Sequence, residues 1–260
     1  MHVALVGPCA PGDLVDLLDD ASASAARSVA GYRGIPVSEL ARALVNEGHT
    51  VSVATLTYRP EDAVGDFVGP RLAIRVARGR TRPRHHLPDL YAQERREMAG
   101  FLKEVRPDIV HAHWTYEFEL AAQDSGLPHV TTAHDAPITI LRHVRDPYRL
   151  ARLAVSAKAV GGIRELSVVS PYLATRWRRE MRYRRRILTI PNSVPHDVAG
   201  IPRRPSSQPV ILVVADASRL KNVRGLLLAF QRVRDSVPSA ELRLVGPGLE
   251  PNSQFAASAG

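Results

Sequence analysis

Short apolar runs alternate with longer amphipathic stretches along most of the chain, and this pattern predicts strands alternating with helices. Most positions in these runs are apolar, and not only every second one, which is typical of strands in a parallel sheet that is covered on both faces. We therefore expect a doubly wound, parallel α/β domain of the Rossmann-like type over residues 1–191. The expected strands are residues 2–7, 51–56, 72–77, 108–113, 129–133, 166–169 and 187–190. The expected helices are residues 36–46, 87–105, 115–123, 138–160 with a break near Pro147, and 172–180.

The alternation stops and then restarts late in the chain. Residues 192–209 are rich in proline and lack apolar periodicity, so we interpret them as a linker. A strand over 210–215, a helix over 220–237 and a strand over 241–245 follow, and we expect the last ten residues to fray. Residues 210–260 thus predict the start of a second Rossmann-like domain, incomplete and too small to bury a core of its own.

Polar side chains follow two of the central strands. His111, His113 and Trp114 end the run at 108–113, and His134 and Asp135 follow the run at 129–133. In open parallel sheets, ligands bind beyond the carboxyl ends of the strands. We therefore expect His134 and Asp135 to serve function, with His113 at the same edge of the sheet.

Two other interpretations of these histidines remain open. His111 and His113 share one face of a strand, so they could chelate a metal ion with His134 or Asp135 as a further ligand. Two histidines without a firm third ligand are a weak signal, and we predict no metal. A buried, hydrogen-bonded core residue is the simpler interpretation of His111, and Trp114 could be a packing residue.

A glycine-punctuated loop precedes the helix at 36–46. Gly31 and Gly34 place flexible backbone just before the helix begins, an arrangement that can cradle a phosphate group or another part of a ligand. The glycine spacing is irregular, so the loop is a weak signal by itself.

The formal net charge of +9 comes almost entirely from arginine, concentrated at residues 78–86 and 176–186. Such runs attract polyanions, including nucleic acid and anionic membrane surfaces. Nucleic-acid binding also needs aromatic side chains near the charge, and only Trp177 and Tyr183 supply them. A nucleic-acid partner is therefore the weaker hypothesis, and an anionic membrane surface is the stronger one.

The single cysteine, Cys9, excludes a disulfide framework and indicates a reducing cytoplasm. We see neither a secretory signal nor an apolar run of the roughly 18 residues that a membrane span requires. We expect a cytoplasmic protein, peripheral on the inner face of the membrane through its basic segments.

Five segments, in this order and spacing, carry a family resemblance: PDIVHAHW, PHVTTAHD, ILTIPNSV, ILVVADASRLKNVRGLLLAF and ELRLVGPGLE. Together they resemble the family 4 glycosyltransferases of the GT-B fold, from residue 2 to about residue 250. The resemblance implies two Rossmann-like domains, an acceptor bound by the first and a nucleotide-sugar bound by the second. It also implies sugar transfer with retention of configuration, with no metal and no cofactor beyond the nucleotide-sugar as co-substrate.

The resemblance also assigns residues. His134, with Asp135 beside it, is implied to face the transferred sugar, and Lys221, followed by Asn222, to clasp the donor diphosphate. The family's usual Gly-Arg pair before that lysine is Ala215-Asp216 here, so Arg219 is the candidate for the second phosphate cation. Asn192 matches the hinge asparagine, followed by Ser193 instead of glycine. The loop candidates on the acceptor side are Gly31, Gly34, His113 and Trp114.

One family motif, Glu-x7-Glu in the second domain, has no counterpart in this sequence. We therefore expect a C-terminally truncated transferase with weak activity, moving a hexose to an acceptor that the sequence does not identify. A non-catalytic remnant of such an enzyme, a basic nucleic-acid or anionic-surface binder and a sugar epimerase on the same fold remain alternatives. An epimerase would release a changed free sugar without any acceptor.

Overall fold

The apolar runs of the first 190 residues form one eight-stranded sheet in the computed structural model, which describes residues 1–193, 198, 200–202 and 206–259. The chain divides into two compact units, a first that ends at Ala199 and a second that begins, apart from Arg142–Val144, at Gly200. Each unit is described by itself. The expected linker at 192–209 lies partly outside the described residues.

The sheet of the first unit has the strand order β3-β4-β2-β1-β5-β6-β7-β8. All neighbours pair in parallel except β3 and β4, which are antiparallel. The chain winds outward from β1 in one direction and then from β5 in the other, so the order reverses between these two strands. The strands are β1 (His2–Val6), β2 (Thr50–Thr57), β3 (Gly65–Val68), β4 (Leu72–Arg78), β5 (Ile109–His113), β6 (His129–Ala133), β7 (Leu166–Val168) and β8 (Ile187–Thr189).

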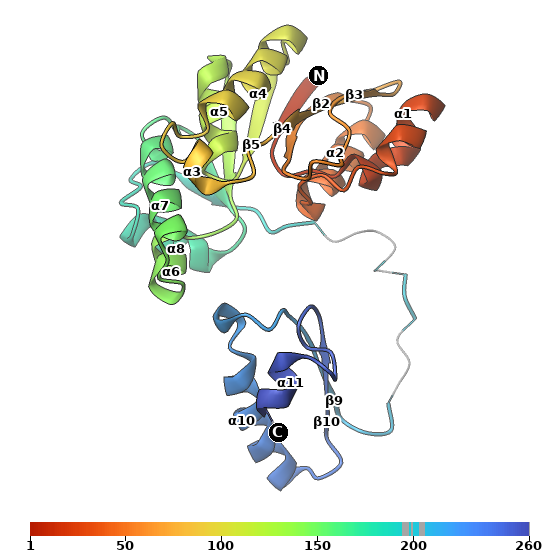
Figure 1. Ribbon diagram of the computed structural model, residues 1–260, viewed down its shortest axis with the longest axis vertical. Helices are drawn as coiled ribbons and strands as arrows, with labels where there is room; N and C mark the ends of the chain where they lie inside the picture. The colour runs from red at the N-terminus through yellow and green to blue at the C-terminus, as the bar shows by residue number, and fades with distance from the viewer. Residues whose placement is uncertain (194–197, 199, 203–205, 260) are drawn as a thin grey trace. The chain divides into compact units, whose positions relative to one another are not determined.

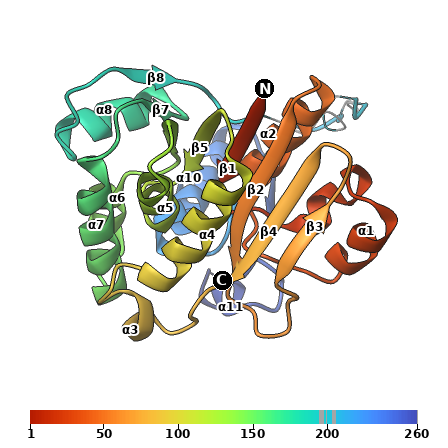
Figure 2. The same cartoon turned by 90° about the horizontal axis from the view of Figure 1, so that it is seen from above.

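Helices cover both faces of this sheet, as Figure 1 and Figure 2 show. One face packs against η1, α1 and α2, and the opposite face packs against α4 and α5, each through a separate apolar cluster. The predicted doubly wound α/β fold is confirmed. The helices are η1 (Pro11–Leu17), α1 (Asp20–Ala26), α2 (Ile35–Asn46), α3 (Pro83–His86), α4 (Ala92–Val105), α5 (Glu117–Ser125), α6 (Pro137–His143), α7 (Pro147–Val160) and α8 (Pro171–Arg179).

The structure corrects two predictions in the first unit. The short antiparallel edge strand β3 was not predicted, because its sequence GDFV contributes only one buried side chain, Phe67. The helix expected over 87–105 begins only at Ala92, as α4, and the short α3 ends before it at His86. Leu90 and Tyr91 adopt left-handed backbone conformations, with φ of 54° and 62°, and these end any continuous helix there.

The second unit pairs β9 (Val210–Val214) in parallel with β10 (Glu241–Val245), joined by η2 (Arg219–Lys221) and α10 (Val223–Ser236). The helix expected over 220–237 therefore begins only at Val223, because Asn222 is left-handed with a φ of 50°. The expectation that the last ten residues fray is wrong for α11 (Gln254–Ala259), where three alanines and the Ser253 cap favour a helix.

Among the described residues, no helix has the length and apolar character needed to cross a bilayer.

Candidate functional site

Two histidines from neighbouring strands meet at the carboxyl edge of the sheet. His113 ends β5 and His134 follows β6, and the parallel pairing of Val110 with His129 brings these strand ends side by side. His113 Nδ1 lies 3.0 Å from His134 Nε2, and the rings are 5.2 Å apart and nearly parallel. The prediction that both residues lie at one edge is confirmed.

Burial keeps these imidazoles neutral. It lowers the pKa of His134 to about 4. Burial, with His111 and His134 close by, lowers the pKa of His113 well below its ordinary value. His113 Nε2 is buried and has no hydrogen-bond partner among the residues that the structure describes. At neutral pH the pair therefore offers uncharged hydrogen-bonding nitrogens and no cation.

His111 has a structural role that fits its simpler interpretation. Its Nε2 lies 2.7 Å from Thr132 Oγ1, which is itself 2.5 Å from Ser167 Oγ, so polar side chains link β5, β6 and β7. Burial, with a smaller contribution from His134, lowers the pKa of His111 to about 4. Within the described part of the chain, no three His, Cys, Asp or Glu side chains are placed to hold a metal ion.

Gly7 leaves room for the histidine pair. It follows β1 beside the reversal of the strand order, and a Cβ at this position would stand 2.8 Å from His113 Cβ. Side chains essentially never approach so closely, so any residue larger than glycine would displace His113. Sequence analysis noted Gly7 only as the end of a strand.

The glycine loop packs against the segment that follows β1. Gly31 has a φ of 59°, and a Cβ on Gly34 would meet the Pro8 carbonyl oxygen at 2.2 Å. The Gly31 amide donates to Asp62 Oδ2 at 2.9 Å, and the Ala30 amide donates to Asp62 Oδ1 at 3.1 Å. A carboxylate of the protein therefore occupies the Ala30 and Gly31 amides in this conformation.

Asp135 is held by aromatic side chains. The Tyr116 hydroxyl lies 3.1 Å from both carboxylate oxygens, and Trp177 Nε1 donates to the Asp135 backbone carbonyl at 2.9 Å. Burial raises the pKa of Asp135 above its ordinary value, against the hydrogen bond from Tyr116 and nearby arginines. The side chain is thus fixed next to His134, with Tyr116 as its immediate partner.

A buried ion pair lies behind Tyr116. Arg152 of α7 donates to Glu117 of α5 in a short contact, and both side chains are almost fully buried. The guanidinium of Arg152 also stacks on the Tyr116 ring, with 3.6 Å from Cζ to the ring centroid. Sequence analysis missed Tyr116, Glu117 and Arg152, because the partners are 35 residues apart and no local motif joins them.

Trp114 follows β5 in a left-handed conformation with a φ of 69°. Its ring packs edge to face against Tyr32 of the glycine loop, with centroids 5.2 Å apart. The structure thus brings together the predicted His113, Trp114, His134 and Asp135 and the loop that contains Gly31 and Gly34.

The second unit holds the remaining predicted residues and a cavity of about 880 Å³. Arg219 and Asn222 line this cavity, together with the first turn of α10, but Lys221 does not. Lys221 is exposed on η2. The hydrogen bonds from Ser218 are the main cause of the lowered pKa of Asp216, and the charge of Lys221 makes a smaller contribution. The start of a helix and the cation Arg219 at the same cavity suit an anionic group.

The sequence has no match among curated proteins. Several solved structures are similar in fold. The catalytic domain of starch synthase IV from Arabidopsis thaliana, bound to ADP and acarbose, has a TM-score of 0.56 at 13% identity, over 99% of this chain and 70% of that chain. A sucrose-phosphate synthase from Thermosynechococcus elongatus has a TM-score of 0.47 at 15% identity, over 76% of this chain and 93% of that chain.

A UDP-GlcNAc 2-epimerase from Neisseria meningitidis bound to UDP-GlcNAc has a TM-score of 0.49 at 13% identity, over all of this chain and 68% of that chain. At such identities these likenesses concern the fold alone. The sequence itself matches the family model of Glycosyltransferase Family 4 over residues 37–198, a range that contains β2 to β8, the histidine pair and Asp135. Because this match spans more than half of the 260 residues, the chain belongs to glycosyltransferase family 4.

Proposed function

We propose that this protein transfers a hexose from a nucleotide-sugar to a hydroxyl group of an acceptor, with retention of configuration. The observation that carries the proposal is the neutral pair of His113 and His134 beside Asp135, at the carboxyl edge of a domain that matches the family. In the reaction the acceptor oxygen bonds to the anomeric carbon, and the bond from that carbon to the phosphate oxygen breaks. The nucleoside diphosphate leaves with the bonding electrons, and the acceptor proton passes to it.

His134 acts in this proposal as a neutral hydrogen-bonding group to the transferred sugar. A pKa of about 4 leaves only about one imidazole in a thousand protonated at pH 7, so His134 is a poor general acid. His113 fixes the ring of His134 through their hydrogen bond. The carboxylate of Asp135, which Tyr116 holds in place, accepts hydrogen bonds from hydroxyl groups of the sugar.

The second unit supplies the groups for the leaving diphosphate. Negative charge builds on that group as the bond breaks, and fixed cations and amides aimed at it lower the barrier. Arg219 and Asn222 line the cavity at the start of α10, and Lys221 lies two positions after Arg219 and directly before Asn222. We assign the donor phosphates to this cavity, with Arg219 in the role of the second cation.

We also propose a cytoplasmic location with peripheral attachment to anionic lipid. The single Cys9 is buried, and burial raises the pKa of its thiol to about 12, so it carries no thiolate for disulfide exchange. The exposed arginines of residues 178–186 provide the basic surface for the lipid.

The test measures release of nucleoside diphosphate from a panel of nucleotide-sugars, with and without acceptor. His134→Ala should lower the rate by about a hundredfold, as expected for loss of one preorganised hydrogen-bonding group. His49→Ala is the matched control, because His49 lies just before β2, at the opposite end of the sheet from the site. NMR of the product reports the anomeric configuration.

Equal rates for the His134 and His49 variants would refute the assigned site. A changed free sugar formed without acceptor would identify an epimerase instead. Absence of any turnover with every donor would favour a non-catalytic protein.

A further inference from the structure

A second cavity in the first unit, of about 250 Å³, adjoins the site. Every lining residue belongs to a segment that follows the carboxyl end of a strand. Two contacts connect the cavity to the histidine site: Tyr32 packs on Trp114, and Arg152 joins Glu117 to Tyr116. We call it the tyrosine cavity, and its lining residues are Tyr32, Tyr58, Thr81, Pro83, His86, Tyr91, Glu117 and Tyr148.

The tyrosine cavity has no uncompensated charge to offer a ligand. Its one carboxylate, Glu117, is already bonded to the buried Arg152, which also donates to the Tyr91 hydroxyl at 3.1 Å. Burial raises the pKa of Tyr32 and Tyr58, so both hydroxyls stay protonated. A charged ligand would be desolvated here without a partner, which is costly. The cavity therefore selects an uncharged group.

Five of the eight lining side chains are aromatic rings, and their arrangement suits a flat guest. Tyr32 and Tyr58 meet edge to face at 5.6 Å, and Tyr91 stacks on His86 at 4.3 Å. Aromatic guests gain from both edge-to-face and offset-stacked contacts. The volume lies below the roughly 300–1,000 Å³ of sites for drug-sized ligands, so the guest has one or two rings.

His86 adds one polar requirement. Its Nδ1 lies 2.7 Å from the Arg80 carbonyl oxygen, which can only accept, so Nδ1 carries the proton. In the neutral ring Nε2 is then an acceptor, and it is buried without a partner in the described part of the chain. A guest hydroxyl supplies the missing donor. A sugar ring would bring several hydroxyls on both of its faces against aromatic walls, whereas a phenol brings one at its edge.

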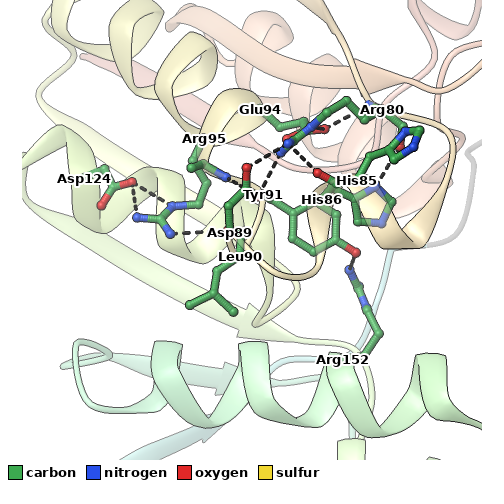
Figure 3. A network of polar contacts seen from close by, with 11 residues as sticks. Arg80, His85, His86, Asp89, Leu90, Tyr91, Glu94, Arg95, Asp124 and Arg152 are labelled. Carbon is green, nitrogen blue, oxygen red and sulfur yellow. Dashed lines mark hydrogen bonds and ion pairs between the residues drawn. The ribbon is translucent and has the colours of Figure 1, made fainter.

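The segment that forms the wall of the tyrosine cavity is held in one conformation before any ligand binds. Leu90 and Tyr91 are consecutive non-glycine residues with positive φ, a strain that persists only where the surroundings hold it. Figure 3 shows the network that holds this segment: Arg80 bonds Glu94 through Nη2 at 2.6 Å and Asp89 through Nη1 at 2.7 Å. The Ala92 amide donates to Asp89 as α4 begins. Preorganisation of this kind lowers the cost of binding.

We propose that the tyrosine cavity binds an uncharged aromatic ring that carries a hydroxyl group. Resting on the proposed function, this ring is the acceptor or the part of the acceptor that selects it. The enzyme would accordingly glycosylate small phenolic or hydroxylated aromatic compounds.

Binding is tested without donor, so that the result is independent of transfer. The full chain is titrated with 2-naphthol, which is neutral at pH 7, and binding is followed by fluorescence anisotropy. Thr81→Trp places a large ring in the cavity from an exposed position, so it leaves the core intact. We expect at least tenfold weaker binding for Thr81→Trp and unchanged binding for the matched control Arg82→Trp, which places the same ring at an exposed position that does not line the cavity.

Competition identifies the ligand class. Neither 2-naphthoate nor methyl glucoside should displace 2-naphthol at concentrations where a second phenol does. Displacement by the sugar or the carboxylate, or wild-type binding by Thr81→Trp, overturns the proposal. Phenol binding without diphosphate release for any donor would leave the ligand class standing and refute the transferase. Transfer to sugars alone, without phenol binding, would refute the proposed ligand class and leave the transferase proposal standing.

Discussion

The two units of the chain follow the same strand-helix-strand pattern but bury very different amounts of apolar surface. In the first unit, Phe118, Leu102 and Trp177 are inaccessible to solvent, and four apolar clusters occupy the space between sheet and helices. In the second unit, Leu212 is 61% exposed and Leu228 is 65% exposed. Among its described residues, only Val223 and Ala240 are buried hydrophobics.

The contrast shows that local pattern alone forms the elements, whereas the number of strands determines whether a core forms. A buried network can position a catalytic group to a fraction of an ångström, but a two-stranded sheet gives such a network little to pack against. The groups that require fixed geometry, His113, His134 and Asp135, lie in the first unit.

The largest expected difference between the units concerns ion pairs. Glu117→Ala leaves Arg152 buried without its partner, and we expect a loss of about 3–5 kcal/mol in the free energy of unfolding. Glu241→Ala breaks the exposed pair with Arg243 and should cause no measurable change. Denaturation followed by tryptophan fluorescence checks the first value, since both tryptophans lie in the first unit. A loss below about 1 kcal/mol for Glu117→Ala would contradict the assignment of a buried pair.

A smaller effect is expected from Asp62, whose carboxylate accepts from Thr57, Gly31 and Ala30. Burial acts to raise the pKa of Asp62, but these hydrogen bonds outweigh it and lower the pKa below its ordinary value. Asp62→Asn should cost about 1–3 kcal/mol at neutral pH. Because the native pKa is the lower one, this cost is complete above about pH 5 and fades as the pH falls below about 4. Denaturation at several pH values tests this, and a cost that grows on acidification would contradict it.

Most of the first unit could be predicted from the sequence, because strands such as residues 2–7 are mostly apolar and because Pro147 and Ser170 mark helix starts. Sequence analysis placed His134 and Asp135 correctly at a strand end for the same reason. It missed Asp62, Glu117, Arg152 and the cavity that Tyr32 and Tyr58 share, because these contacts join residues that are distant in sequence. The left-handed Tyr91 also has no local signal, since its conformation is held by burial and by the Arg80 network.

Substitution of exposed arginines in the first unit should weaken membrane binding by an intermediate amount. Arg178, Arg182 and Arg184 surround a shallow depression beside Tyr183. Arg184→Ser and Arg185→Ser should each weaken binding to phosphatidylserine vesicles about fivefold, from about 1 kcal/mol per charge near the surface. The matched change in the second unit, Arg232→Ser with Arg234→Ser, should have less effect. Vesicle sedimentation measures this, and equal binding to neutral vesicles would refute it.

The smallest effect is expected in the second unit. Leu212→Ser removes an exposed side chain, so the free energy of unfolding should change by less than about 0.5 kcal/mol. Thermal unfolding followed by circular dichroism measures this change. Val53→Ser, at a fully buried position of β2, is the matched change in the first unit and should be strongly destabilising. A large loss for Leu212→Ser would show that the face of β9 is covered in solution.

The arginine network at Arg80 also makes part of the molecule insensitive to acidity. A guanidinium keeps its charge at any pH at which proteins are folded. The hydrogen bonds from Arg80 lower the pKa of Asp89 and outweigh the opposing effect of burial. For Glu94, burial is the largest single influence and acts to raise the pKa. The hydrogen bonds that Glu94 accepts from Arg80 outweigh it, so the pKa of Glu94 is lowered as well. From about pH 5 upward, none of the three groups changes its charge. The wall that carries Tyr91 therefore keeps one shape while the surrounding solution is acidified or made alkaline, and a phenolic guest would meet the same ring positions across that range.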